Sequence, residues 1–242
     1  MKLIRILNEY LLISGLKSTS FDRSSNPLPN NYIFNRTMNE SLSLDISAIR
    51  VGKIKLLANA QLPGIDLTGA ILPEADFYQA YLLGVNFTGA NLQKAVLRAN
   101  LRGSDFTGAD LRGADFRNAD LRGAILIDAQ LREASFAGAF LNGAILSNLD
   151  LSGIDFRGAD LRGVNLTRAN LFQAELSSAN LSGADLSQAN LEEANLNGAV
   201  LRGTNLQRAN LLCASVEQAD LTGTLLTDAC VKGTLLDEIK SE

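Results

Sequence analysis

The sequence of 242 residues contains no histidine and no tryptophan. Histidine is the commonest general base and a frequent zinc ligand, so its absence weighs against most hydrolases, metalloenzymes and proton relays. The two cysteines, Cys213 and Cys230, are too few for a disulfide framework or a four-cysteine metal site. No phosphate-binding loop or dinucleotide-binding fingerprint is present either. We therefore expect a protein that is not an enzyme and that has no catalytic residues, no cofactor and no metal.

Long apolar runs and an excess of basic residues are also missing. No stretch approaches the roughly 18 apolar residues of a transmembrane helix. Near the N-terminus, Asn8 and Glu9 interrupt the apolar run that a signal peptide would need. The net charge of −4 is unlike that of a nucleic-acid-binding protein. We expect a cytoplasmic protein that contacts neither a membrane nor nucleic acid directly, and whose two cysteines are free thiols, with a disulfide as the alternative.

Residues 1–59 stand apart from the rest of the chain. Near the start, apolar residues recur at three- and four-residue spacing, which predicts an amphipathic helix that packs on the rest of the protein. Docking to a membrane surface or to a partner is the alternative. The apolar residues of this helix are Leu3, Ile6, Leu7, Tyr10 and Ile13.

Two stretches follow this helix. Residues 17–31 predict a loop, because they are rich in serine, asparagine and proline. Residues 32–59 are ambiguous. A helix with Ile46 and Ile49 on one face is favoured over a strand through alternating apolar residues.

From Ala60 to Leu236 the chain repeats every five residues. A large apolar residue stands at the centre of each unit, and 34 of the 36 central residues are Leu or Phe. Alanine usually stands two positions before the centre, Asp or Asn one position before it, and glycine two positions after it. Eighteen of the 20 glycines occupy that last position.

A period of five fits neither the 3.6 residues of a helical turn nor the alternation of a strand. Glycine accepts the positive φ that the third residue of a type II turn requires, so each unit is predicted to be an extended step followed by a corner. Four steps close a square coil of about 20 residues, and coils stack about 4.8 Å apart. Side chains one coil apart then lie above one another, which predicts an internal column of Phe116, Phe136 and Phe156.

Runs such as 109–113 and 159–163 match the consensus A(D/N)LxG, and in this the sequence resembles the pentapeptide repeat family. The resemblance covers residues 60–236. It implies an all-β solenoid, a right-handed quadrilateral β-helix of about nine coils. Residues 1–59 would then form a short, helical N-terminal capping segment, and residues 237–242 a C-terminal tail. The resemblance also implies a bacterial protein, above all a cyanobacterial one, and most members of the family have no assigned biochemical activity.

The repeat has one irregularity in its length. The step from Leu97 to Leu101 is four residues instead of five. We expect the missing residue to be absorbed at one corner of the coil. A kink that shapes a binding surface is the alternative.

Apolar side chains break the polar pattern of the outward positions in three places. A group in the first two coils is expected to be covered by the N-terminal helix, because a solenoid needs capped ends. A second group is a candidate interaction patch for a protein partner or a second copy, the alternative being scattered apolar residues without a role. A third group is expected to cap the last coil, or to join two copies end to end. The first group is Ile71, Tyr78, Tyr81, Leu83 and Val96; the second is Ile125, Ile127, Ile145 and, on the neighbouring face, Phe140; the third is Leu225, Val231, Leu235, Leu236 and Ile239.

Residues 60–236 carry a net charge of −6. Family members that resemble duplex DNA in size and charge protect or inhibit type II topoisomerases, and this resemblance supplies the alternative function of a DNA mimic. Such mimicry needs a dense anionic face, whereas five aspartates here stand two residues before an arginine with which they can pair. These pairs are Asp110/Arg112, Asp115/Arg117, Asp120/Arg122, Asp155/Arg157 and Asp160/Arg162.

Four arginines recur on one predicted face and form a candidate basic ladder, Arg102, Arg122, Arg162 and Arg202. The ladder could bind a phosphate-rich or acidic partner, or be a solvated face balanced by Asp120 and Asp160. The function that we predict is a non-enzymatic scaffold, a rigid rod whose side-chain ladders bind an unknown protein partner. The predicted partners include a second copy of the protein, which would give a homodimer.

Overall fold

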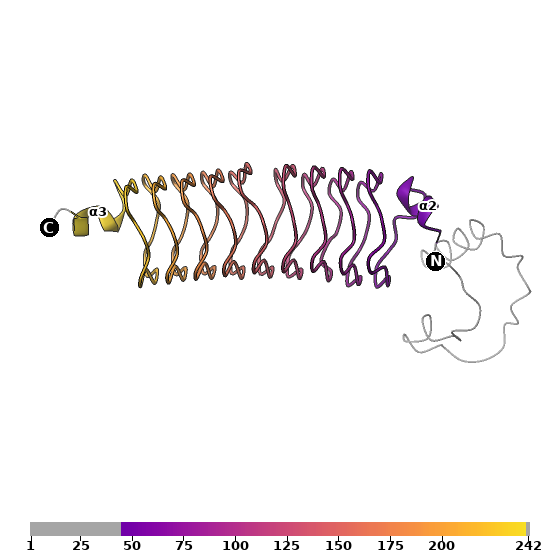
Figure 1. Cartoon of the computed structure of the whole chain (residues 1–242), viewed down its shortest axis with the longest axis horizontal. Coiled ribbons are helices and arrows are strands. Elements are labelled where there is room, and N and C mark those ends of the chain that lie inside the picture. The colour runs from indigo at the N-terminus through magenta and orange to yellow at the C-terminus, as the bar shows by residue number, and fades with distance from the viewer. Residues whose placement is uncertain (1–44, 241–242) are drawn as a thin grey trace, which may run out of the picture. The chain divides into compact units, whose positions relative to one another are not determined.

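The computed structural model describes residues 45–240, with side chains described up to Asp237. The predicted amphipathic helix and the predicted loop at residues 17–31 lie outside the described residues. The part from Asp45 onward forms one compact unit. It contains two short helices, α2 (Ile46–Arg50) and α3 (Leu235–Lys240), and between them a continuous stack of β-coils (Figure 1).

Each coil is joined to the next by isolated parallel β-bridges rather than by long strands. The bridges run from Leu56↔Asp76 to Asn210↔Cys230, and nearly all join residues 20 apart. Each side of a coil contributes a single bridging residue, the outward residue that precedes the central one. We call the four sides face 1 to face 4, with Leu121, Leu126, Leu131 and Phe136 as their respective central residues in one coil.

The local structure of a unit follows from its five residues. The central residue and the small residue two positions before it point inward and are buried, as with Leu111 and Ala109, each of which has no exposed surface. A turn then follows, in which Ala114 N donates to Leu111 O at 3.0 Å. The corner residue of this turn, Gly113, has a φ of 69°. The predicted left-handed corner is therefore confirmed.

Non-glycine residues also occupy these corners. Seventeen of them have a positive φ, and most are polar, such as Glu74, Asn118 and Arg168. A left-handed residue costs roughly 1–2 kcal/mol when it is not glycine. At most of these corners the backbone N–H offsets part of this cost through a bond to the next coil, as Asn118 N does to Ala137 O at 3.0 Å.

Phenylalanines fill the interior of the first half of the rod. Phe136 stacks on Phe116 at 4.8 Å and on Phe156 at 5.2 Å between ring centroids, so the predicted column is confirmed. A second stack on face 2 joins Phe87 and Phe106 at 5.0 Å. The two stacks meet edge to face, and offset and edge contacts of this kind are the favoured aromatic geometries.

The missing residue between Leu97 and Leu101 is absorbed at one corner, as predicted. Ala99 N donates to Leu97 O at 2.9 Å, so a turn of three residues replaces the usual turn of four. Bridges across this coil join residues 19 apart, such as Tyr81↔Asn100, and 20-residue spacing returns at Asn100↔Asp120.

The β-ladder opens at one place on face 3. Among the described residues, no hydrogen bond joins Leu131 N to Asp150 O or Asp150 N to Ala129 O, although the repeat predicts both, and Gln130 and Asp150 form no bridge. Coils are visibly further apart near the middle of the rod (Figure 1). Leu149 and Ile154 hold inward positions that are usually alanine, and both are buried. Their extra volume in the narrow position explains the opening, since overpacking shifts the backbone.

The N-terminal end of the stack is closed by α2. Asp45 caps this helix by accepting from Ala48 N at 2.9 Å, and Ile49 is fully buried, so the helical alternative for Ile46 and Ile49 is confirmed. The coil register already holds at Leu57, which is 2% exposed.

The C-terminal end is less well covered. Val231 is buried and Leu236 half-buried, whereas Leu225 and Leu235 are about half exposed, at 50% and 57%. The side chain of Ile239 lies outside the described side chains.

Candidate functional site

The surface of the rod, rather than a cleft, carries the candidate sites. Among residues 45–240, no group of three or more His, Cys, Asp or Glu could hold a metal ion, and no helix is long and apolar enough to cross a membrane. Cys213 and Cys230 are both exposed free thiols, so they do not form a disulfide in this structure. The functional reading therefore rests on how the outward side chains are arranged.

Three of the four residues in the predicted apolar patch lie on face 2. Ile125 and Ile145 form a parallel bridge, so they are direct neighbours in successive coils. Ile127 lies two residues further along the same face and is 40% exposed. Phe140, 46% exposed, lies on face 1 and bridges to Asp120 and Asp160. The structure thus brings the three isoleucines together and places Phe140 across the corner at Gly143.

The apolar residues of the first two coils do not form one surface. Ile71 lies on face 3, Tyr81 and Leu83 lie on face 1, and Tyr78 and Val96 lie on face 4. Ile71 is 56% exposed, while Tyr81 and Val96 are half-buried. Tyr78 already has a partner, because the guanidinium of Arg98 lies 5.5 Å from the centre of its ring. The helix predicted to cover these residues lies outside the described part of the chain, so that contact stays a prediction.

All five predicted Asp–Arg pairs are formed. In each, the Nε and one Nη of the arginine donate to the two oxygens of the aspartate, as Arg162 does to Asp160 at 2.8 and 2.7 Å. The same carboxylate also accepts from Arg162 N at 3.3 Å. These hydrogen bonds, above all those from the side chain of Arg162, lower the pKa of Asp160 below its usual 3.8. The aspartates are largely covered by their arginines, which remain about half exposed; the pairs are Arg112/Asp110, Arg117/Asp115, Arg122/Asp120, Arg157/Asp155 and Arg162/Asp160.

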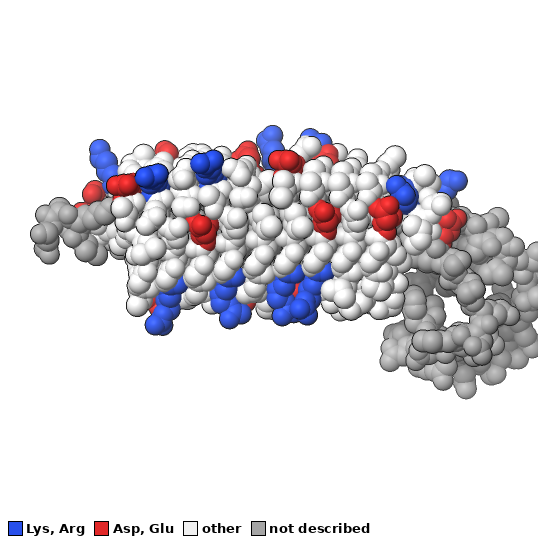
Figure 2. Space-filling model, viewed as in Figure 1, with Lys and Arg blue, Asp and Glu red and all other residues white. Residues whose placement is uncertain are grey.

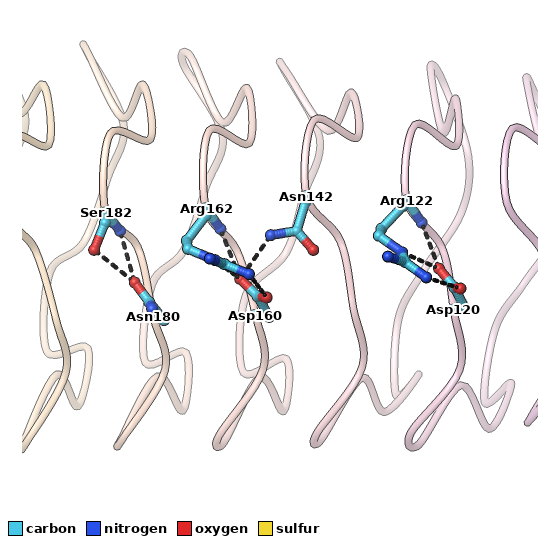
Figure 3. A network of polar contacts seen from close by, with 7 residues as sticks. All are labelled: Asp120, Arg122, Asn142, Asp160, Arg162, Asn180 and Ser182. Atoms are coloured by element: carbon cyan, nitrogen blue, oxygen red, sulfur yellow. Dashed lines mark hydrogen bonds and ion pairs between the residues drawn. The ribbon is translucent and has the colours of Figure 1, made fainter.

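The predicted basic ladder lies on face 1, at the outward position that follows the central residue. Arg122 and Arg162 are paired to the aspartates of their own strands, and Asn142 between them donates to Asp160 at 2.8 Å (Figure 3). Arg202 lies 3.6 Å from Asp220 of the next coil. The guanidinium of Arg102 has no hydrogen-bond or ion-pair partner among the described residues. Lys and Arg side chains form a row along one side of the rod, with few acidic side chains visible among them (Figure 2).

Glycine holds every corner that follows face 1, a feature that our sequence interpretation missed. The other three kinds of corner carry Glu, Lys, Arg, Gln, Asn and Asp as well as glycine in the same left-handed conformation. Space does not demand glycine at Gly123 or Gly143, because a Cβ built there meets nothing within 4 Å. Reading the corner positions in steps of one coil would have revealed this edge; it consists of Gly64, Gly84, Gly103, Gly123, Gly143, Gly163, Gly183, Gly203 and Gly223.

Comparison with known proteins identifies relatives of this rod. A family model described as pentapeptide repeats matches residues 60–98, 98–126, 124–163, 150–188 and 189–228. HetL, a pentapeptide repeat protein of the cyanobacterium Nostoc involved in heterocyst differentiation regulation, is 36% identical. The match covers 78% of this chain and 92% of HetL, with a TM-score of 0.46.

Two further solved structures are more distant. Rfr23, a pentapeptide repeat protein from the cyanobacterium Cyanothece, is 26% identical over 54% of this chain and 89% of its own, with a TM-score of 0.35. QnrB1, a plasmid-mediated fluoroquinolone resistance protein, is 22% identical over 76% of this chain and 87% of its own, with a TM-score of 0.34. No curated protein sequence matches this chain.

Proposed function

This chain belongs to the pentapeptide repeat family, whose fold is a right-handed β-helix solenoid, and from this premise we propose that it is a non-enzymatic scaffold that binds a protein partner. A solenoid of this kind buries its side chains in regular internal layers and presents long, flat faces. Such faces suit recognition of another macromolecule, because they offer a large contact area rather than an enclosed site for a small substrate. The proposal includes the cytoplasmic location expected from the sequence.

The apolar patch on face 2 carries this proposal. Most outward positions on that face are Asp, Asn, Thr or Ser, as at Asp105 and Thr107, and there the hydroxyl donates to the carboxylate at 2.6 Å. Ile125, Ile127 and Ile145 interrupt this pattern within two successive coils. A compact apolar group in an otherwise polar ladder is typical of a protein-binding surface.

The similarity to HetL supports a regulatory setting for the scaffold. HetL takes part in the regulation of a differentiation programme, and 92% of its length aligns with this chain at 36% identity. We propose that this chain also takes part in regulation, and that it does so by holding a regulatory protein.

Capture of the partner tests the proposal. The full-length protein would be immobilised and incubated with native cell extract, and retained proteins identified by mass spectrometry. A variant with Ile125→Asp and Ile145→Asp should lose the specific partner. The matched control, Asn86→Asp with Asn165→Asp, adds the same charge at equivalent positions of face 2 and should keep it. A partner retained equally by both variants would exclude the patch as the binding surface.

The alternative function, a DNA mimic that binds or inhibits a type II topoisomerase, has less support. The five Asp–Arg pairs neutralise much of the negative charge that mimicry of a DNA backbone would need. A supercoiling assay with added protein discriminates the two functions. Inhibition at micromolar concentration would favour the mimic, and no effect would dismiss it.

We also propose the finer architecture that the sequence predicts. Residues 60–236 would form about nine coils, residues 1–59 a helical capping segment and residues 237–242 a tail. Within the capping segment, the N-terminal helix would cover exposed apolar residues of the first coils, such as Ile71. Deletion of residues 1–40 should then increase binding of a hydrophobic dye and lower the unfolding temperature. An unchanged dye signal together with an unchanged unfolding temperature would contradict the cap.

A further inference from the structure

Face 1 differs from the rest of the rod in its local charge. From Asn100 to Asp220, its outward positions carry four arginines and three aspartates, although residues 60–236 as a whole carry a net charge of −6. All four arginines are exposed, whereas Asp120 and Asp160 are largely covered by their arginine partners. The outermost charges of this face are therefore positive, and they favour an acidic partner.

The paired arginines keep donors for a partner. In its bidentate pair, Arg162 uses Nε and one Nη for Asp160, and 57% of its side-chain surface is exposed. The guanidinium is planar and meets the aspartate with one of its edges. Its remaining N–H groups lie on the other side of the group and point away from the aspartate. Pairing also fixes the orientation of these side chains, so less conformational entropy is lost when a carboxylate binds.

The spacing of the ladder selects a partner conformation. From Arg122 onward, arginines alternate with short polar side chains, so that Arg122, Arg162 and Arg202 lie two coils apart. Asn142 and Ser182 hold the intervening positions, and Figure 3 shows this row from Arg122 to Ser182. Face 1 is continuous here, with Phe140 bridged to both neighbouring coils. Two coils span about 9.6 Å. A polyproline II helix repeats every three residues over about 9.3 Å, and its residues i, i+3 and i+6 share one side.

An aromatic side chain and a bare edge complete the surface. Phe140 lies on face 1 in the coil between Arg122 and Arg162 and is 46% exposed. Aromatic surfaces of this kind receive the proline rings of polyproline II ligands. Beside the arginines, the corner residues Gly123 and Gly143 carry no side chain, so a ligand backbone can approach the rod closely.

We propose that face 1 binds a partner segment in polyproline II conformation with an acidic residue at every third position, aligned with the rod axis. The carboxylates pair with Arg122, Arg162 and Arg202, and the intervening prolines pack on Phe140 and against the glycine edge. This inference rests on the proposed scaffold function and names the chemistry of the partner.

Fluorescence anisotropy with the full-length protein tests the inference. The probe is a labelled peptide of four Pro-Pro-Glu repeats. Two comparison peptides are used. One contains the same residues as the probe with its four glutamates contiguous, and the other consists of four Pro-Pro-Pro-Glu repeats. The first peptide should bind at least about tenfold more tightly than either comparison peptide. Equal binding of all three would reduce the interaction to unspecific charge attraction and overturn the proposal, as would tighter binding of a labelled oligothymidine.

Matched variants locate the site. Arg122→Gln with Arg162→Gln should weaken peptide binding at least about tenfold. The control Arg117→Gln with Arg157→Gln removes two arginines with the same spacing and the same pairing from face 4, and should bind as the parent does. Equal loss in both pairs of variants would overturn the assignment to face 1.

The glycine edge is tested in the same assay. Gly143→Asn places a side chain between Arg122 and Arg162 and should weaken binding. The control Gly153→Asn makes the same change at a corner of face 3, where a Cβ also meets nothing within 4 Å. Equal binding by these two variants would exclude close approach at the edge. The two proposals can fail separately. If the variant with Ile125→Asp and Ile145→Asp loses the cellular partner while the unchanged protein does not bind the peptide, this inference is refuted and the scaffold proposal stands.

Discussion

Nε of Arg98 donates to the backbone carbonyl of Arg117 at 3.3 Å. In a complete corner this carbonyl would accept from the backbone N–H of the corner residue, as Arg98 O itself does from Gln79 N at 2.9 Å. The corner after Leu97 lacks that residue, and a side chain supplies the donor instead. The β-ladder therefore continues across a coil that is one residue short.

Because the Arg98 side chain replaces a missing backbone donor, we predict that Arg98→Ala destabilises the protein modestly. The bond is exposed, so water can replace it, and the contact with Tyr78 is lost as well. We expect a loss of about 1 kcal/mol in the free energy of unfolding, measured by urea denaturation. Insertion of a glycine between positions 98 and 99 of the variant should restore a backbone donor and recover the part of the loss that comes from the missing hydrogen bond. An insertion that recovers none of the loss would contradict this account.

The opening on face 3 predicts a local difference in hydrogen exchange. Because they lack their acceptor in the neighbouring coil, the amides of Leu131 and Asp150 should exchange faster than those of Leu111 and Gln130, which bond at 2.8 and 2.9 Å. Amide-resolved hydrogen exchange by NMR measures this difference. Equal protection at the four amides would show that the ladder is closed in solution.

The phenylalanine column predicts a large cost for truncation inside the rod. Phe136 has no exposed surface and stacks on two neighbours, so Phe136→Ala should lower the free energy of unfolding by about 3–5 kcal/mol. Phe140→Ala removes the same ring from the surface and should change the free energy of unfolding by no more than about 0.5 kcal/mol. Thermal and urea denaturation of both variants provide the comparison, and similar losses would disprove a special role for the column.

Gly52 predicts a steric effect at the junction after α2. A Cβ at this position would lie 2.3 Å from the backbone oxygen of Ile71, and φ is +73°. Gly52→Ala should therefore lower the unfolding temperature clearly more than Gly153→Ala, which meets only the left-handed backbone penalty of about 1–2 kcal/mol. Differential scanning calorimetry of the two variants tests this, and equal shifts would refute the clash.

The paired aspartates predict a loss of stability in acid. Side-chain hydrogen bonds from their arginines lower the pKa values of Asp110, Asp155 and Asp160 below the usual 3.8. A carboxyl whose pKa is lower in the folded state stabilises it above the unfolded pKa and loses this effect as the pH falls through the folded value. Urea midpoints should therefore be steady from pH 7 to about 5 and fall below pH 4. Asp120→Asn with Asp160→Asn should flatten this fall, and an unchanged slope would exclude a contribution from these pairs.

Much of the fold was predictable because its interactions are either local or one coil apart. The turn at Gly113 depends on five neighbouring residues, and the stack of Phe116 on Phe136 depends only on a 20-residue period. The Asp–Arg pairs were equally predictable, since two residues separate the partners along an extended step. The apolar patch was predictable only in part, because the period places Ile125 beneath Ile145 without saying how far Phe140 lies around the corner.

The sequence by itself determined the coil, its corners and its side-chain columns, because a short repeat imposes the same geometry on every unit. Only the tertiary structure decided where the coils depart from that regular geometry. In that structure, the side chain of Arg98 replaces a missing backbone donor. The large buried side chains of Leu149 and Ile154 accompany a loss of hydrogen bonds between two coils on face 3. The structure also shows the arginines of face 1 covering their aspartates, so that positive charge is outermost. These outcomes depend on how neighbouring coils compete for the same space and the same hydrogen-bond acceptors, which a linear pattern does not encode.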